Sequence, residues 1–156
     1  MKQPYLRKAF SMLTALVVIV LMATVAIFVM SLSGKIVKST TAQFQREQAE
    51  LYAKSYTEYA VLAVTGNDRS SNCLQTINGT IGSPTTGNGY RIRTHIAYIG
   101  PSSEISICAS TRRLSTNVTT PETPLSIIID AYVDYKDPDN TSGPWLTVHR
   151  RSIQKI

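Results

Sequence analysis

Few side chains in this sequence have the types and spacing that catalysis or metal binding requires. Cys73 and Cys108 are the only cysteines, and they form either a disulfide or two reduced, buried thiols. His95 and His149 are the only histidines, and no nucleophile and orienting carboxylate accompany either one in a catalytic pattern. No two of these four residues are close enough in sequence for a zinc motif. The sequence therefore predicts a protein that is not an enzyme and has no cofactor.

An acidic, turn-rich segment, DYKDPDNTSG, runs from Asp134 to Gly143. Asp137 and Asp139 offer carboxylate oxygens at alternate positions, and oxygen is the ligand that Ca²⁺ prefers. The EF-hand pattern is not met, because no glycine or closing glutamate stands at the required position. The segment predicts a solvated turn built on Pro138 and Gly143, with a calcium site at Asp137 and Asp139 as the alternative.

Basic residues give the chain a formal net charge of +6. Lys2, Arg7 and Lys8 contribute three of these charges, so the overall charge gives little support for general nucleic-acid binding. The later basic residues form either a patch on one face or the ordinary solvated side of a sheet, since acidic residues occur among them. These residues are Arg91, Arg93, Arg112, Arg113, Arg150, Arg151 and Lys155.

The longest uncharged segment lies near the N-terminus. It reads FSMLTALVVIVLMATVAIFVM from Phe10 to Met30, and no charged residue follows before Lys35. As a helix this segment would be roughly 32 Å long, which matches the hydrocarbon core of a bilayer. Basic residues precede it, so the N-terminus is expected in the cytoplasm and everything after residue 34 across the membrane. In that oxidising compartment a Cys73–Cys108 disulfide is favoured.

Three kinds of protein share this outline: a secreted protein with a signal peptide, a protein with a plain signal anchor, and a prepilin. Ser31-Leu32-Ser33 is an acceptable signal-peptidase site, although the apolar core is longer than that of an ordinary signal peptide. The basic leader, however, ends in Arg7-Lys8-Ala9, and Phe10 opens the apolar segment without a spacer. In these features the sequence resembles the prepilin family, which comprises type IV pilins and the pseudopilins of type II secretion systems.

The resemblance implies that a leader peptidase cuts between Ala9 and Phe10 and methylates the new N-terminus of Phe10. Two positions differ from the usual pattern. Ala9 stands where the family usually has Gly, and Thr14 stands where it usually has Glu. In the family that carboxylate is thought to pair with the N-terminal amine of a neighbouring subunit, and a threonine hydroxyl supplies no such charge. The substitution favours a minor or tip subunit over a major one.

The helical pattern continues beyond the apolar segment. No proline occurs between Tyr5 and Pro84, and Thr65-Gly66-Asn67-Asp68 supplies a stop signal. One helix is therefore expected from Phe10 to about Val64. Its second half carries apolar and small residues at helical spacing, which predicts an amphipathic helix packed against a globular head. These residues are Val37, Phe44, Leu51, Ser55, Tyr59 and Leu62.

After residue 65 the sequence alternates between turns and short apolar segments. Alternation is clearest from Tyr90 to Tyr98 and in residues 126–135. Shorter strands are expected at residues 73–77, at 105–107, and at 145–148 together with Ile153. Asn78-Gly79 is expected to form a hairpin turn after the first of these. Five strands behind one long helix predict an α+β fold with an antiparallel sheet, which is also the architecture that the resemblance implies.

The expected organisation is a cleaved basic leader at residues 1–9, a transmembrane and assembly helix at 10–34, its amphipathic continuation at 35–65, and a β-rich head at 66–156. The resemblance implies a structural subunit of a type IV pilus or type II secretion filament, acting in protein secretion, adhesion or motility. It is held in the bacterial inner membrane, with its head in the periplasm, until assembly. Its implied partners are other pilin or pseudopilin subunits, the leader peptidase, the inner-membrane assembly platform and the lipid bilayer.

Two alternatives stay open. One is a DNA-uptake pilin, because pilins of competence systems contact DNA through basic patches such as the one that Arg91, Arg93 and their companions would form. The other is a single-pass, membrane-anchored binding domain that never polymerises.

Overall fold

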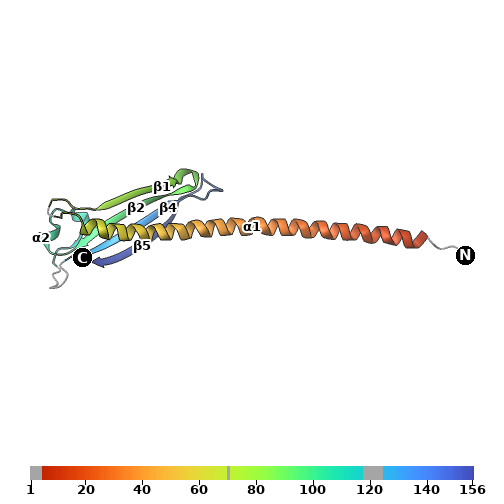
Figure 1. Ribbon diagram of the computed structural model, residues 1–156, viewed down its shortest axis with the longest axis horizontal. Coiled ribbons are helices and arrows are strands. Elements are labelled where there is room, and N and C mark those ends of the chain that lie inside the picture. The colour runs from red at the N-terminus through yellow and green to blue at the C-terminus, as the bar shows by residue number, and fades with distance from the viewer. Residues whose placement is uncertain (1–4, 70, 118–124) are drawn as a thin grey trace. The chain divides into compact units, whose positions relative to one another are not determined.

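The computed structural model describes residues 5–69, 71–117 and 125–156, with side chains from residue 12 onward. The chain divides into two compact units, residues 1–43 and 44–156, and α1 contributes to both. The predicted α+β fold is confirmed: one long helix is followed by a five-stranded sheet (Figure 1). The elements are α1 (Tyr5–Thr65), β1 (Thr76–Ser83), η1 (Pro84–Thr86), β2 (Asn88–Ile99), α2 (Ser102–Ile105), η2 (Ser110–Arg112), β3 (Arg113–Ser115), β4 (Ser126–Tyr135) and β5 (Leu146–Lys155).

Helix α1 is longer at its N-terminal end than the sequence predicted. It spans 61 residues and begins at Tyr5, inside the expected leader, whereas the prediction began at Phe10. No proline interrupts it, so its backbone hydrogen bonds continue without a break. It ends at Thr65, and the N–H of Gly66 donates to the carbonyl of Leu62 at 3.0 Å, which closes the last turn. The boundary between the two units falls at Phe44, within the segment expected as the amphipathic continuation.

The sheet has the order β1-β2-β4-β5, and each of these neighbouring pairs is antiparallel. β4 is therefore a central strand, and β5 lies at an edge. Short β3 pairs in parallel with the end of β2, at Tyr98 and Ile99, beyond the part of β2 that β1 covers. The sheet is thus antiparallel except for this one short strand. Figure 1 shows the long strands side by side behind the C-terminal part of α1.

The helix face that packs on the sheet is not the one that the sequence predicted. Among the residues expected to face the head, Phe44, Leu51 and Leu62 are 60%, 65% and 69% exposed, and Ser55 and Tyr59 are exposed as well. The opposite face, made of small residues, is buried instead. Small side chains let the helix approach the sheet closely, and the larger side chains of β2 and β4 fill the interface. The buried helix residues are Ala49, Ala53, Thr57, Ala60 and Val64.

Two clusters of buried residues form the core between α1 and the sheet. One joins Ala60 and Val64 of the helix to β2 and β4 residues that include Ile96 and Ile129. The other joins Ala49 and Ala53 to a second set. Thr57 is buried between them, and its hydroxyl donates to the carbonyl of Ala53 at 2.7 Å, so its polar atom is satisfied. The second set is Tyr90, Ile92, Ala131, Val133 and Tyr135.

Two local predictions are wrong. Asn78-Gly79 lies inside β1 and makes no turn; the hairpin closes through η1 and Gly87, which has a φ of 78°. A Cβ on Gly79 would overlap the hydroxyl of Tyr56, so this glycine serves a close contact with the helix. Residues 105–107 form no strand either. Ile105 ends α2 and is buried, whereas Ile107 is half exposed, and the fifth strand is β3.

Candidate functional site

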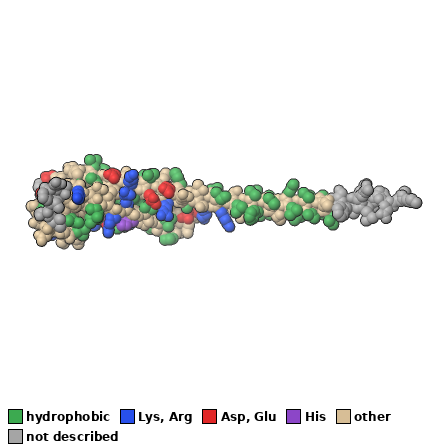
Figure 2. All heavy atoms as spheres, turned by 90° about the horizontal axis from the view of Figure 1, so that it is seen from below, with side chains coloured by type: hydrophobic (Ala, Val, Ile, Leu, Met, Phe, Trp, Pro, Cys, Tyr) green, Lys and Arg blue, Asp and Glu red, His purple; other side chains and the backbone are tan. Residues whose placement is uncertain are grey.

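The apolar part of α1 is long enough to cross a membrane. Its most apolar 18-residue stretch has a mean hydropathy of 2.9, and none of that stretch is buried. Hydrophobic side chains run along the visible face of this part of the helix (Figure 2), and Leu16, Ile19 and Phe28 are all more than half exposed. The hydroxyl of Thr24 donates to the carbonyl of Leu21 at 2.8 Å, which satisfies a polar group within the segment. The segment thus offers lipid or a partner helix a continuous apolar surface.

The expected processing site lies at the N-terminal end of the same helix. Ala9 and Phe10 belong to α1, and their side chains, like those of Arg7 and Lys8, lie outside the described residues. Lys2 precedes the described chain altogether. Thr14, at the position where the resemblance expects a glutamate, lies within α1 and is exposed.

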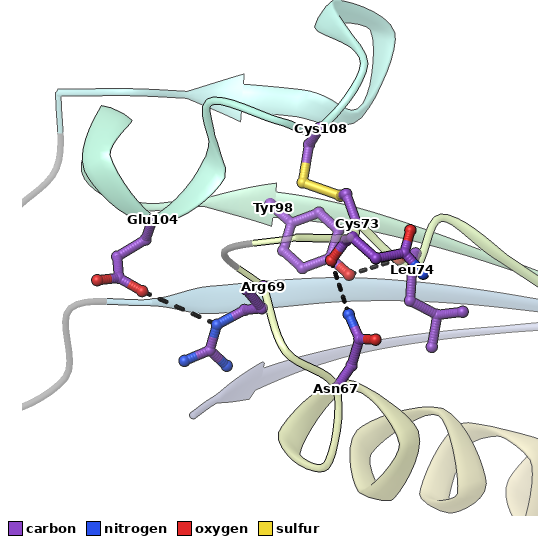
Figure 3. Close-up of a disulfide and its surroundings, with 8 residues drawn as sticks. Asn67, Arg69, Cys73, Leu74, Tyr98, Glu104 and Cys108 are labelled. Atoms are coloured by element: carbon purple, nitrogen blue, oxygen red, sulfur yellow. Dashed lines mark hydrogen bonds and ion pairs between the residues drawn. A yellow bond between two sulfur atoms is a disulfide. The ribbon is translucent and has the colours of Figure 1, made fainter.

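The predicted disulfide is present between Cys73 and Cys108, whose Cα atoms lie 5.1 Å apart. It ties the loop after α1 to the segment after α2 (Figure 3). Beside it the hydroxyl of Tyr98 donates to the carbonyl of Leu74, and burial raises the pKa of Tyr98 to about 12. The disulfide therefore closes a buried corner of the core in which the tyrosine stays neutral.

The most polar part of the head is the face of the sheet that points away from α1. Because side chains alternate along a strand, the charged residues of β2 and β4 that lie between buried ones point to this outer face. His149 and Arg151 of β5 lie on the same face, since both pair with Asp130 of β4. Figure 2 shows Lys and Arg side chains interspersed with Asp and Glu over the head. The outer face therefore carries both signs of charge, and two carboxylates, Asp130 and Asp134, organise it.

Asp134 is the centre of the first group. Its side chain is 1% exposed and contacts Arg91 and Arg93 at 3.0 and 2.9 Å, while the Thr147 hydroxyl donates to it at 2.8 Å. Burial alone would raise the pKa of Asp134, but hydrogen bonds from Arg93, Thr147 and Arg91 outweigh it and hold the pKa below the usual value. Arg91 also lies 4.5 Å from the ring centre of Trp145, a cation–π contact. Asp134 is therefore ionised and fully engaged.

Asp130 is the centre of the second group. It accepts two hydrogen bonds from the Arg151 guanidinium, at 2.8 and 2.9 Å, and one from Nε2 of His149 at 2.7 Å. Hydrogen bonding from Arg151 is the largest cause that lowers the pKa of Asp130. The His149 ring stacks on Tyr132, with 4.4 Å between ring centres and 10° between planes. His149 is thus held by a carboxylate and an aromatic ring together.

The six arginines expected to form one patch do not all meet on this face. Arg112 reaches it by donating to Nδ1 of His95 at 3.0 Å, and burial followed by the Arg112 charge lowers the pKa of His95. Arg113 lies in β3 with its Nε buried, without a hydrogen-bond partner among the described residues. Arg150 follows the strand alternation to the opposite face, on the side of α1. Arg91, Arg93 and Arg151 are paired with carboxylates, so the charges of these three side chains are compensated within the head.

The segment expected to offer calcium ligands forms a hydrogen-bonded turn. The backbone N–H of Asp139 donates to Oδ1 of Asp137 at 2.9 Å, and the N–H of Asn140 donates to the Asp137 carbonyl at 3.0 Å. The Asp137 carboxylate therefore already caps its own turn. Within the described ranges no group of three or more His, Cys, Asp and Glu side chains is placed to hold a metal ion.

The carboxylates that organise the outer face were not predicted from the sequence, although strand periodicity carried a signal for them. Asp130 and Asp134 stand four residues apart in a strand that alternates apolar and polar residues, so they share a face. Trp145 and the alanine face of α1 were also missed. No family model matches this chain, and neither a curated protein nor a solved structure is similar enough to match it.

Proposed function

We propose that this chain is a pilin-like structural subunit, a minor pilin or pseudopilin that assembles into a type IV pilus or a type II secretion filament. The observation that carries the proposal is the apolar, charge-free segment of α1 joined to a helix that packs on the sheet of an α+β head. A subunit of this kind stays in the inner membrane through its apolar segment and later exchanges lipid for sister helices. Its head lies in the periplasm, where the oxidising compartment suits the Cys73–Cys108 disulfide.

The head supports the proposal through the outward face of its helix. Phe44, Leu51 and Leu62 are exposed on the side of α1 opposite the sheet. They recur at helical spacing and form an apolar stripe that the fold of the head leaves uncovered. A filament, in which helices of neighbouring subunits pack together, would cover such a stripe.

The sequence around the processing site gives the proposal its most direct test. We expect the leader peptidase to remove residues 1–9 and to leave N-methyl-Phe10 as the first residue. Mass spectrometry of the intact chain, co-expressed with a prepilin peptidase and extracted from membranes, measures this directly. The Ala9→Leu variant should remain uncut, because a bulky side chain replaces the small one before the scissile bond. Ala15→Leu, the same change inside the apolar segment, serves as the control and should be processed normally.

Other N-termini would identify other kinds of protein. An intact Met1 in the presence of active peptidase would contradict the pilin proposal and favour a membrane-anchored binding domain. A mature chain that begins at Gly34 would show ordinary secretion and would remove the apolar segment from the mature protein altogether.

A further inference from the structure

The last strand of the sheet presents a free edge. β5 pairs with β4 along its whole length, from Leu146 to Lys155, and with no other strand in the described part of the chain. A strand has hydrogen-bonding groups on both edges, so the second edge of β5 presents N–H and C=O groups that no neighbouring strand pairs. A free edge of this length is a template for an additional strand, and the basic side chains of β5 disfavour pairing with another basic strand.

A groove of about 470 Å³ follows this edge. Five consecutive residues of β5, 146–150, line one side, and Arg46, Glu50 and Ala53 of α1 line the other. Successive side chains of a strand point to opposite faces of the sheet. Five consecutive residues can therefore border the same groove only where the groove follows the edge of their backbone. The groove is therefore bounded by a strand edge on one side and by a helix on the other.

The charge of the groove comes from one arginine. Arg46 and Glu50 compensate each other at 3.3 Å. His149 and Arg151 of β5 are held by Asp130 on the outer face. Arg150 points to the groove side, and no hydrogen bond or ion pair joins it to another residue in the described ranges. The groove thus combines unpaired backbone groups with one uncompensated positive charge.

We propose that this groove binds an extended, acidic polypeptide segment, which adds to the sheet as a strand beside β5. The backbone of the segment pairs with the free edge, and a carboxylate side chain pairs with Arg150. A small apolar side chain two residues away lies against Val148 and Ala53, because alternate residues of a strand share a face. This proposal is independent of the pilin function, since it rests on the head alone.

Among the described strands of the head, a second copy of this chain offers no acidic edge strand. The free edges of the described head are β1, which reads TINGTIGS and carries no charge, β3, which reads RLS, and β5 itself, which carries basic residues and no acidic one. Pairing β5 with β5 would bring like charges together, and β1 or β3 would leave Arg150 without a carboxylate. From the charges of these strands, the occupant that we propose is a segment of a different polypeptide.

Fluorescence anisotropy of a labelled, end-blocked peptide tests the proposal on the full chain in detergent micelles. The probe is Thr-Val-Thr-Glu-Thr-Val-Thr, whose valines and glutamate share one face of a strand. We expect Arg150→Gln to weaken binding roughly fivefold to tenfold, the loss typical of one partly exposed charge pair. Arg151→Gln, the matched control on the opposite face, should change binding less than about twofold. Arg150→Glu should instead prefer the companion peptide with lysine in place of glutamate.

A third peptide, N-methylated at every internal residue so that neither edge can donate, separates strand addition from simple charge attraction. Strand addition requires the backbone N–H groups, so this peptide should bind at least about tenfold more weakly. Equal binding of the methylated and parent peptides would overturn the proposal, and so would equal losses from the two arginine variants. The proposal would also be overturned if the parent peptide did not bind at millimolar concentration. The same holds if the chain self-associates and the Arg150→Glu substitution changes that self-association.

Discussion

Replacing Asp134 with asparagine tests whether the buried carboxylate holds the outer face together. The side chain is 1% exposed, whereas its partners Arg91 and Arg93 are 44% and 43% exposed. The arginines can therefore regain water when the charge is lost, and the cost stays below the 3–5 kcal/mol of a fully buried broken pair. Two charge-assisted hydrogen bonds at roughly 1–1.5 kcal/mol each give a destabilisation of about 2–3 kcal/mol. For a head of this size, that corresponds to a melting temperature lower by about 8–12 °C.

The assay follows urea unfolding of the full chain in detergent micelles by the fluorescence of Trp145, the only tryptophan. Trp145 contacts Arg91 and so reports on the region of the substitution. The pH dependence gives a second readout. Because hydrogen bonds lower the pKa of Asp134 in the folded state, its stabilisation is present above the unfolded pKa, near 3.9, and is lost as the pH falls through the folded pKa. The difference between wild type and Asp134→Asn should therefore narrow below about pH 4.

Asp130→Asn is the matched control, since it removes a carboxylate from the same strand and the same face. Its partners Arg151 and His149 are 62% and 41% exposed, so we expect a loss of no more than about 1 kcal/mol. Equal losses from the two substitutions, or a difference for Asp134→Asn that stays constant from pH 7 to pH 3, would refute the reasoning from burial.

Two further predictions concern the stability of the head. Replacing both Cys73 and Cys108 with serine should destabilise the head by about 4 kcal/mol, because the unfolded chain regains the entropy of a loop of 35 residues. Urea unfolding of the wild type with and without reductant checks this value. A loss of stability below about 1 kcal/mol would contradict the prediction. Gly79→Ala should cost about 1 kcal/mol, because the new Cβ overlaps the hydroxyl end of Tyr56, a half-buried side chain that must move aside. Tyr56→Leu combined with Gly79→Ala should then cost less than the sum of the single changes, and additive losses would count against a direct clash.

The long elements could be predicted because their signals are local. The apolar segment without proline predicted α1, and the alternation in residues 90–98 and 126–135 predicted β2 and β4. The packing face of α1 could not be found in the same way. Leu51 and Leu62 are more hydrophobic than Ala49 and Ala53, so a hydrophobic pattern favours the leucine face. The alanine face packs on the sheet instead, because small side chains let the helix approach the sheet closely.

The wrong predictions for Gly79 and for the arginine patch have a common cause, because both positions are determined by contacts between residues that are distant in the sequence. Asn-Gly is typical of a hairpin turn, but Gly79 is required where Tyr56 crosses the strand, and that contact joins residues far apart in the chain. The pairing of Arg91 with Asp134 likewise depends on the register between β2 and β4. The sequence prediction placed Arg150 and Arg151 in one patch, although strand alternation alone puts them on opposite faces, since neighbours in a strand point in opposite directions.

Within the head, substitutions on the two sides of α1 have different effects on the stability of the fold. The sheet selects alanine, threonine and valine on one side, so substitutions there alter the melting temperature. On the other side Phe44, Leu51 and Leu62 make no contribution to the core, so we expect their exchange to leave folding intact. Affinity for whatever covers that side can therefore evolve in either direction without loss of a folded, disulfide-bonded domain.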